Sequence, residues 1–70
     1  MPKEFKEIFR QLMIENNLNQ QQMADILGIR QSQVSNLLNG KSNPQYYTIR
    51  QICIRLKVSA DFVLGLEDLE

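Results

Sequence analysis

The stretch that decides the fold is QQQMADILGIRQSQVSNLLN, residues 20–39. On either side of Gly28, its apolar residues recur at steps of three and four, which is the spacing of one face of a helix. Glycine ends the first segment without strain because it adopts positive φ freely. Ala24 supplies the small side chain that two short helices need where they cross closely. The stretch therefore predicts helices over residues 20–27 and 31–38, joined by a tight turn.

The rest of the chain also has a helical pattern. The same apolar spacing predicts further helices at about 5–15, 45–56 and 60–64. Asn19, with Gln22 three residues later, has the form of a capping box before the second helix. No segment alternates apolar and polar residues for long, so no strand is expected. The sequence thus predicts an all-α, compact five-helix domain over residues 1–70, with residues 66–70 as a tail.

Length and composition limit the classes of protein to consider. A chain of 70 residues forms one domain, and such a small domain has little room for a deep catalytic cavity. No run of about 18 apolar residues occurs, so no segment is expected to span a membrane. No signal-peptide pattern opens the chain. The single cysteine, Cys53, cannot form an internal disulfide, which fits a cytoplasmic protein.

The sequence shows none of the common catalytic or metal-binding patterns. The chain has no histidine, and it shows no clustered carboxylate pair, no Cys/His metal spacing and no glycine-rich phosphate loop. We therefore expect neither an enzyme nor a protein that holds a metal or another cofactor.

Positive charge gathers in the middle of the chain although the net charge is zero. No acidic residue occurs between Asp25 and Asp61. The basic residues of that stretch are Arg30, Lys41, Arg50, Arg55 and Lys57. A local cationic excess favours contact with phosphate, although in so short a chain the same pattern also arises by chance.

The motif residues occur in an order known from one family. Along the chain they are Gln20, Met23-Ala24, Leu27-Gly28-Ile29, Val34 and Leu37. Taken together, they resemble the phage-repressor and Cro type of helix-turn-helix domain, the Xre-like family. Flanking segments 18–20, 39–41 and 58–64 extend the resemblance to about residues 5–65. It implies a lambda-repressor-like DNA-binding fold whose second and third helices form the motif, dimeric binding to near-palindromic operators, and no cofactor.

In such a domain the second helix of the motif lies in the major groove of DNA. Its outward polar residues are suited to base edges, because glutamine and asparagine bond adenine and serine bonds several bases. The base-contacting candidates are Gln31, Ser32, Ser35 and Asn36. The candidates for phosphate contacts are Gln20, Arg30, Asn39, Lys41, Ser42 and Asn43. In family members with glutamines at the positions of Gln20 and Gln31, the two side chains support each other.

Two positions depart from the family pattern. Where many members pair an acidic residue with an arginine, this chain has Leu38 and Met13, which predicts a hydrophobic contact in place of the ion pair. Arg30 stands where a serine or threonine cap is common. Loss of that cap would cost roughly 0.5–2 kcal/mol unless a neighbour substitutes.

The sequence favours a DNA-binding transcriptional regulator, most simply a dimeric repressor of a double-stranded operator. The alternative is a protein-interaction module with the same fold, such as an antitoxin or a partner of another regulator. The acidic tail, Leu66-Glu67-Asp68-Leu69, would suit a protein partner or the dimer contact. Leu69-Glu70 is either a native ending or a common junction before an affinity tag.

Overall fold

The computed structural model describes residues 4–66. This part of the chain contains five helices and no strand. They are α1 (Phe5–Glu15), α2 (Gln20–Leu27), α3 (Gln31–Leu38), α4 (Tyr46–Leu56) and α5 (Ala60–Val63). The all-α prediction is confirmed, and α2 and α3 have the bounds expected from the sequence. α4 begins one residue later than expected, because the backbone of Gln45 is extended (φ −83°, ψ 161°) and this residue is the N-cap.

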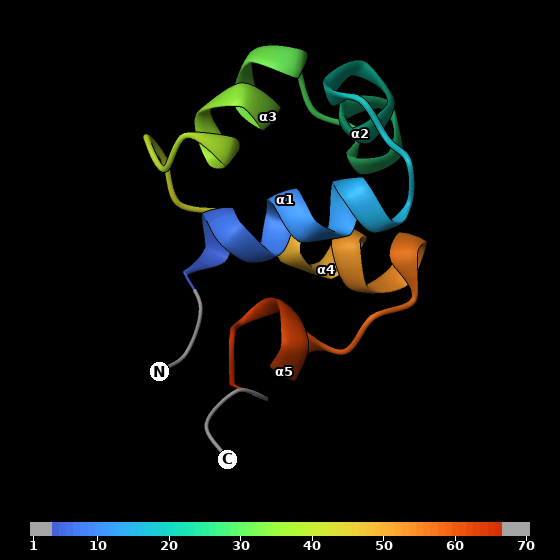
Figure 1. The fold of residues 1–70 in the computed structure, drawn as a ribbon, viewed down its shortest axis with the longest axis vertical. Coiled ribbons are helices and arrows are strands. Elements are labelled where there is room, and N and C mark those ends of the chain that lie inside the picture. Colours follow the sequence, from blue (N-terminus) through green and yellow to red (C-terminus); the bar gives the residue numbers. More distant parts are fainter. Residues whose placement is uncertain (1–3, 67–70) are drawn as a thin grey trace.

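The α2–α3 pair forms one end of the molecule. Figure 1 shows these two helices on one side of α1, while α5 lies on the other side. α1 packs against α3 and α5, whereas α2 packs against both α3 and α4. The other helices therefore pack against the inner side of the α2–α3 pair, and the described residues leave its outer side uncovered.

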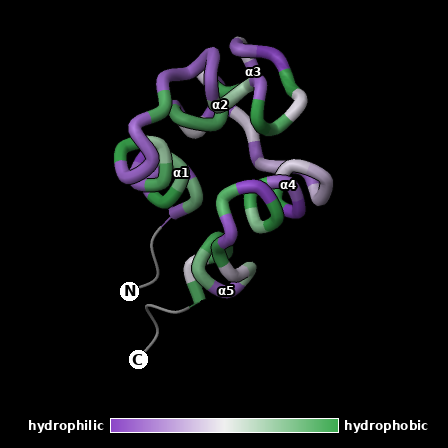
Figure 2. The backbone as a smooth tube through the Cα atoms, turned by 90° about the vertical axis from the view of Figure 1, so that its right-hand side faces the viewer, coloured by the Kyte–Doolittle hydropathy of each residue, from purple (hydrophilic) through white to green (hydrophobic). Residues whose placement is uncertain are grey.

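Every helix contributes to a single apolar core. The largest fully buried side chains are those of Ile8, Phe9, Leu12, Met23, Leu27, Val34, Ile52 and Val63. Figure 2 shows hydrophilic residues along the outer edge of α2 and α3. The core thus fixes which face of α3 turns inward and which face stays accessible.

The ends of α2 follow from its sequence. The Gln22 N–H donates to Asn19 Oδ1 at 2.7 Å, and the Asn19 N–H donates to Gln22 Oε1 at 2.9 Å. This reciprocal pair confirms the capping box and satisfies two backbone donors at once. At the other end Gly28 has φ +70°, and the Ile29 N–H donates to the Ala24 carbonyl at 3.1 Å. The tight turn between the two helices is therefore built as expected.

The two positions that depart from the ion-pair pattern are both buried. Met13 is 7% exposed and Leu38 is 8% exposed, and they belong to the same apolar cluster. Neutral side chains suit this location, because burial of charged groups costs desolvation free energy. The hydrophobic replacement predicted from the sequence agrees with this packing.

None of the described helices has both the length and the apolar composition needed to cross a bilayer. Of the proposed tail, only Leu66 lies within the described residues, where it is exposed. The acidic residues Glu67 and Asp68, and the ending Leu69-Glu70, lie outside them.

Candidate nucleic-acid interface

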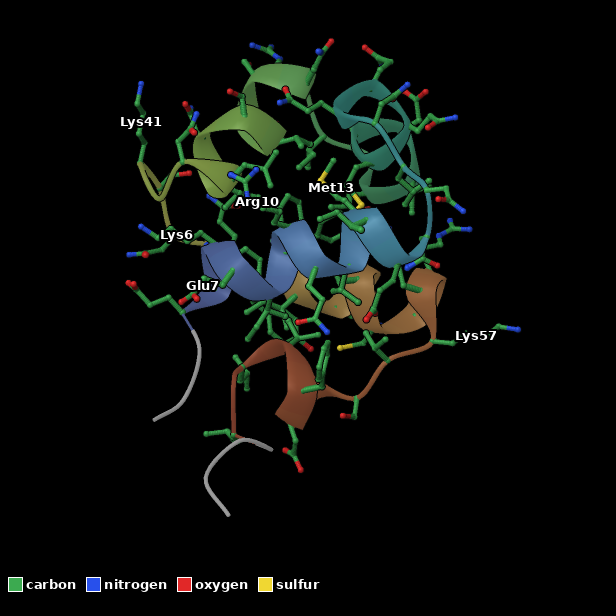
Figure 3. All side chains as sticks on the ribbon, viewed as in Figure 1. Lys6, Glu7, Arg10, Met13, Lys41 and Lys57 are labelled. Carbon is green, nitrogen blue, oxygen red and sulfur yellow. The ribbon has the colours of Figure 1, made fainter. Side chains whose placement is uncertain are left out.

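The outward face of α3 gathers most of the predicted base-contacting residues. Val34 is fully buried, and Leu37 and Leu38 are nearly so, which fixes the rotation of the helix. The outward side chains of Gln31, Ser32 and Asn36 are exposed as a result, and that of Ser35 is half-buried. Figure 3 shows the side chains on the outer side of α3 pointing away from the other helices. The structure therefore presents an uncharged surface of amides and hydroxyls at one end of the molecule.

Three of these side chains are not engaged by the protein. Within residues 4–66, no hydrogen bond ties the side chain of Gln31, Ser32 or Asn36 to another group of the chain. Ser35 differs, because its Oγ accepts a long hydrogen bond (3.4 Å) from Asn39 Nδ2. Unengaged amides and hydroxyls keep their full capacity to donate to and accept from a ligand.

The start of α3 is capped in an unusual way. Arg30 is the N-cap residue, with extended backbone (φ −82°, ψ 152°) and no side-chain cap hydrogen bond. Instead, the Arg30 N–H donates to Gln33 Oε1 at 2.8 Å. Gln33 thus supplies one arm of a capping box and satisfies the Arg30 N–H, while the hydrogen bond that a serine or threonine side chain would accept is not formed. This leaves the exposed Arg30 side chain available at the edge of the α3 surface.

Sequence reasoning missed this role of Gln33, although a signal was present. Gln33 stands three residues after the N-cap, as Gln22 does in α2. In α2 the same spacing predicts a capping box, because an asparagine stands at the N-cap.

The turn at the end of α3 directs the following loop toward the surface. Gly40 has φ +72°, its N–H donates to the Leu37 carbonyl, and the Lys41 N–H donates to the Asn36 carbonyl at 2.9 Å. These two bonds form a Schellman motif, which closes the helix and reverses the chain. Asn39, Lys41, Ser42 and Asn43, all proposed as phosphate contacts, are exposed around this turn.

A groove links the α3 surface to the α3–α4 loop. It has a volume of about 410 Å³, and its lining includes Gln33 and Asn36 from α3 with Ser42 and Asn43 from the loop. One predicted base contact and two predicted phosphate contacts are therefore brought together. Tyr47 of α4 also lines this groove.

Tyr47 supports the turn between α2 and α3. Its hydroxyl lies 3.7 Å from the position that a Cβ on Gly28 would occupy. The same hydroxyl accepts a hydrogen bond from Gln51 Nε2 at 2.8 Å. α4 thus packs against the turn that sets the angle between the two helices.

Gln20 lies apart from the groove, in the first turn of α2, and is half-buried. Within the described residues, Gln20 and Gln31 are not hydrogen-bonded to each other. Their mutual support, implied by the family resemblance, stays a prediction for the DNA-bound protein.

The electrostatic setting is simple. No ion pair joins any two of residues 4–66, so the exposed Arg30 and Lys41 are not neutralised by a partner within them. The same part of the chain contains no cluster of three His, Cys, Asp or Glu residues able to hold a metal ion. The surface is therefore equipped to bind through hydrogen bonds and isolated positive charges.

Comparison with known proteins agrees with this architecture. A family model described as helix-turn-helix matches residues 9–63. Among solved structures, the crystal structure of a transcriptional regulator from Listeria innocua is similar, with a TM-score of 0.83 and 22% sequence identity. The likeness covers 93% of this chain but only 61% of that regulator, and at this identity it shows a shared fold. No curated protein gives a significant match.

Proposed function

Since the chain belongs to the helix-turn-helix family, we propose that it is a transcriptional repressor that binds a near-palindromic double-stranded operator as a dimer. One observation carries the proposal: the outward face of α3 presents polar side chains that the protein itself leaves unengaged. In this motif, that helix enters the major groove and its first residues read base edges. A repressor of this kind acts by occupying its operator. The cytoplasm is the compartment that we expect from the sequence.

Base reading is assigned to Gln31, Ser32 and Asn36, with Ser35 as a weaker contributor because Asn39 already engages its hydroxyl. Glutamine and asparagine form bidentate pairs with adenine, each worth about 1–3 kcal/mol of discrimination. Phosphate contacts fall to Gln20 and Arg30 near the turn, and to Asn39, Lys41, Ser42 and Asn43 at the far end of α3. Such contacts fix the register of the protein on the duplex without reading its sequence.

Dimerisation follows from the small reach of one eight-residue helix, since α3 covers only a few base pairs. The protomer measures 34 × 24 × 23 Å. In the proposed dimer the two α3 helices would lie about 34 Å apart, one turn of DNA. The exposed apolar side chains of Leu64 and Leu66, at the end of α5 and just after it, offer a surface for this pairing. The dimer would be two-fold symmetric, in keeping with a near-palindromic site.

The test starts with selection of bound sites from a random DNA pool, which gives the half-site and its spacing. The double variant Gln31→Ala/Asn36→Ala should then lose operator affinity by roughly 5- to 150-fold for each bidentate contact removed. Its binding to random duplex should change little, because phosphate contacts remain. Gln21→Ala is the matched control, since Gln21 is an exposed glutamine of α2 that hydrogen-bonds Asp25.

Two results would overturn the proposal. Unchanged operator affinity of the double variant would show that α3 does not read bases. Absence of any salt-dependent binding to duplex DNA by the wild-type chain would favour a protein-interaction module with the same fold.

A further inference from the structure

Lys6, in the first turn of α1, lies across the turn that ends α3. A Cβ added to Gly40 would lie 3.1 Å from Lys6 Cδ and 3.7 Å from its Nζ. The aliphatic part of Lys6 therefore packs over the bare Cα of Gly40, and its ammonium is held beside the residue that precedes Lys41. Lysine and glycine are 34 positions apart, so sequence spacing alone could not bring them together.

The surroundings of Lys6 belong to the proposed phosphate-binding segment. Lys6 lines a small hollow of about 120 Å³ together with Gly40, Ser42 and Asn43. Two of these neighbours, Ser42 and Asn43, are already proposed as phosphate contacts. The first turn of α1 and the α3–α4 loop therefore form one continuous edge.

The Lys6 ammonium has no ionic partner in residues 4–66. Glu4 lines the same hollow, and Glu7 lies one residue further along the helix. Glu7 Oε1 accepts a hydrogen bond from the Glu4 N–H at 3.2 Å, at the helix N-terminus, where negative charge is favoured. Lys6 is thus an exposed cation whose stem packs on Gly40 and whose ammonium forms no ion pair within residues 4–66.

The positions of the labelled lysines sharpen this assignment. Figure 3 shows Lys6 and Lys41 pointing outward on the same edge of the molecule, while Lys57 lies on the opposite edge. A phosphate backbone that passes Lys41 along this edge would come next to Lys6.

We propose that Lys6 is a further phosphate contact, which extends the DNA interface from the α3–α4 loop to the first turn of α1. The inference rests on the proposed function, since it names an additional residue of the same interface. Lysine suits the role because its ammonium binds phosphate as a point charge. The contact of its stem with Gly40 reduces the side-chain entropy that binding would otherwise remove.

The salt dependence of operator binding tests this contact. Lys6→Met keeps an apolar stem over Gly40 and removes the charge, whereas Lys6→Arg keeps the charge. Each phosphate contact contributes about 0.9 to the slope of log affinity against log salt. Lys6→Met should therefore lower the slope by about 0.9, so its affinity falls about 3.5-fold less between 50 and 200 mM salt. Lys6→Arg should keep the wild-type slope.

Lys57→Met is the matched control, because it removes the same charge from the opposite edge (Figure 3). Its slope should equal that of the wild type. Thermal unfolding of all variants verifies that each is folded under the binding conditions. Equal slopes for Lys6→Met and Lys57→Met would overturn the proposal, because the effect would then reflect net charge alone.

A second measurement locates the contact on the DNA. Operator duplexes with one neutral methylphosphonate at a time remove single phosphate charges. One substitution outside the base-read positions should weaken the wild-type protein but leave Lys6→Met unaffected. If every substitution weakens both proteins alike, Lys6 binds no phosphate.

The outcomes separate this inference from the proposed function. If the wild type binds its operator and Lys41→Met lowers the slope while Lys6→Met does not, only the inference about Lys6 fails. If the wild type shows no salt-dependent binding, both proposals fail.

Discussion

α2 and α3 have the same length and pack against each other, but they use their polar side chains differently. In α2 the outward glutamines are engaged by the protein: Gln22 completes the capping box, and Gln21 Nε2 donates to Asp25 Oδ1 at 2.9 Å. In α3 the outward Gln31 and Asn36 make no hydrogen bond to the described part of the chain.

The amides of Gln21 and Gln22 thus bond within α2 and its cap, whereas those of Gln31 and Asn36 on α3 stay available to a ligand. The amides of Gln21 and Gln22 are satisfied within the molecule, whereas Gln20 is left for the proposed phosphate contact. On α3, Gln33 is engaged by the Arg30 N–H, but the amides of Gln31 and Asn36 exchange hydrogen bonds with water until a ligand replaces that water. Composition alone hides the distinction, because both helices are rich in glutamine.

The largest effect should come from breaking the buried layer that the two helices share. Leu27 at the end of α2 is fully buried, so Leu27→Ala should lower the free energy of unfolding by about 2–5 kcal/mol. Urea unfolding measures the loss. Ser32→Ala on the exposed face of α3 should stay within about 0.5 kcal/mol of wild type. A cost below about 1 kcal/mol for Leu27→Ala would contradict the packing of this layer.

An intermediate effect should distinguish the two glutamine surfaces directly. Gln31→Ala should weaken operator binding by about 1–3 kcal/mol, since a bidentate base contact is lost. Gln21→Ala should leave operator binding unchanged, because Gln21 bonds Asp25 within α2. Titration of labelled operator with each variant measures both. Equal losses in the two variants would remove the proposed distinction between α2 and α3.

The smallest effect should appear at the two N-caps. Asn19→Ala removes the cap side chain of α2 and should cost about 0.5–2 kcal/mol of stability. Arg30 has no cap hydrogen bond from its side chain, so Arg30→Ala should leave thermal stability almost unchanged. Parallel thermal unfolding of both variants makes the comparison. A larger loss for Arg30→Ala than for Asn19→Ala would mean that the caps are assigned the wrong way round.

Local features of the fold could be predicted from the sequence because their causes are local. Asn19, Gln22 and Gly28 fix the ends of α2 by contacts within a few residues. Apolar spacing alone predicts the start of α4 one residue early, since it does not separate a cap residue such as Gln45 from the first helical residue.

The candidate interface was predictable only where one helix carries it. The outward face of α3 follows from the buried positions of Val34 and Leu37. The position of Lys6 over Gly40 depends on how α1 packs against α3, which no local pattern reports. Assignment of individual bases and phosphates to these residues stays a prediction.

The uncharged character of the α3 surface has a consequence for regulation. Amide and hydroxyl side chains neither gain nor lose a proton across the range of acidity that cells experience, and the chain has no histidine, the residue that most often senses such changes. The proposed base reading by Gln31, Ser32 and Asn36 should therefore be indifferent to pH between about 5 and 8. Occupancy of the operator would then follow the concentrations of protein and salt, and acidification would not release the DNA.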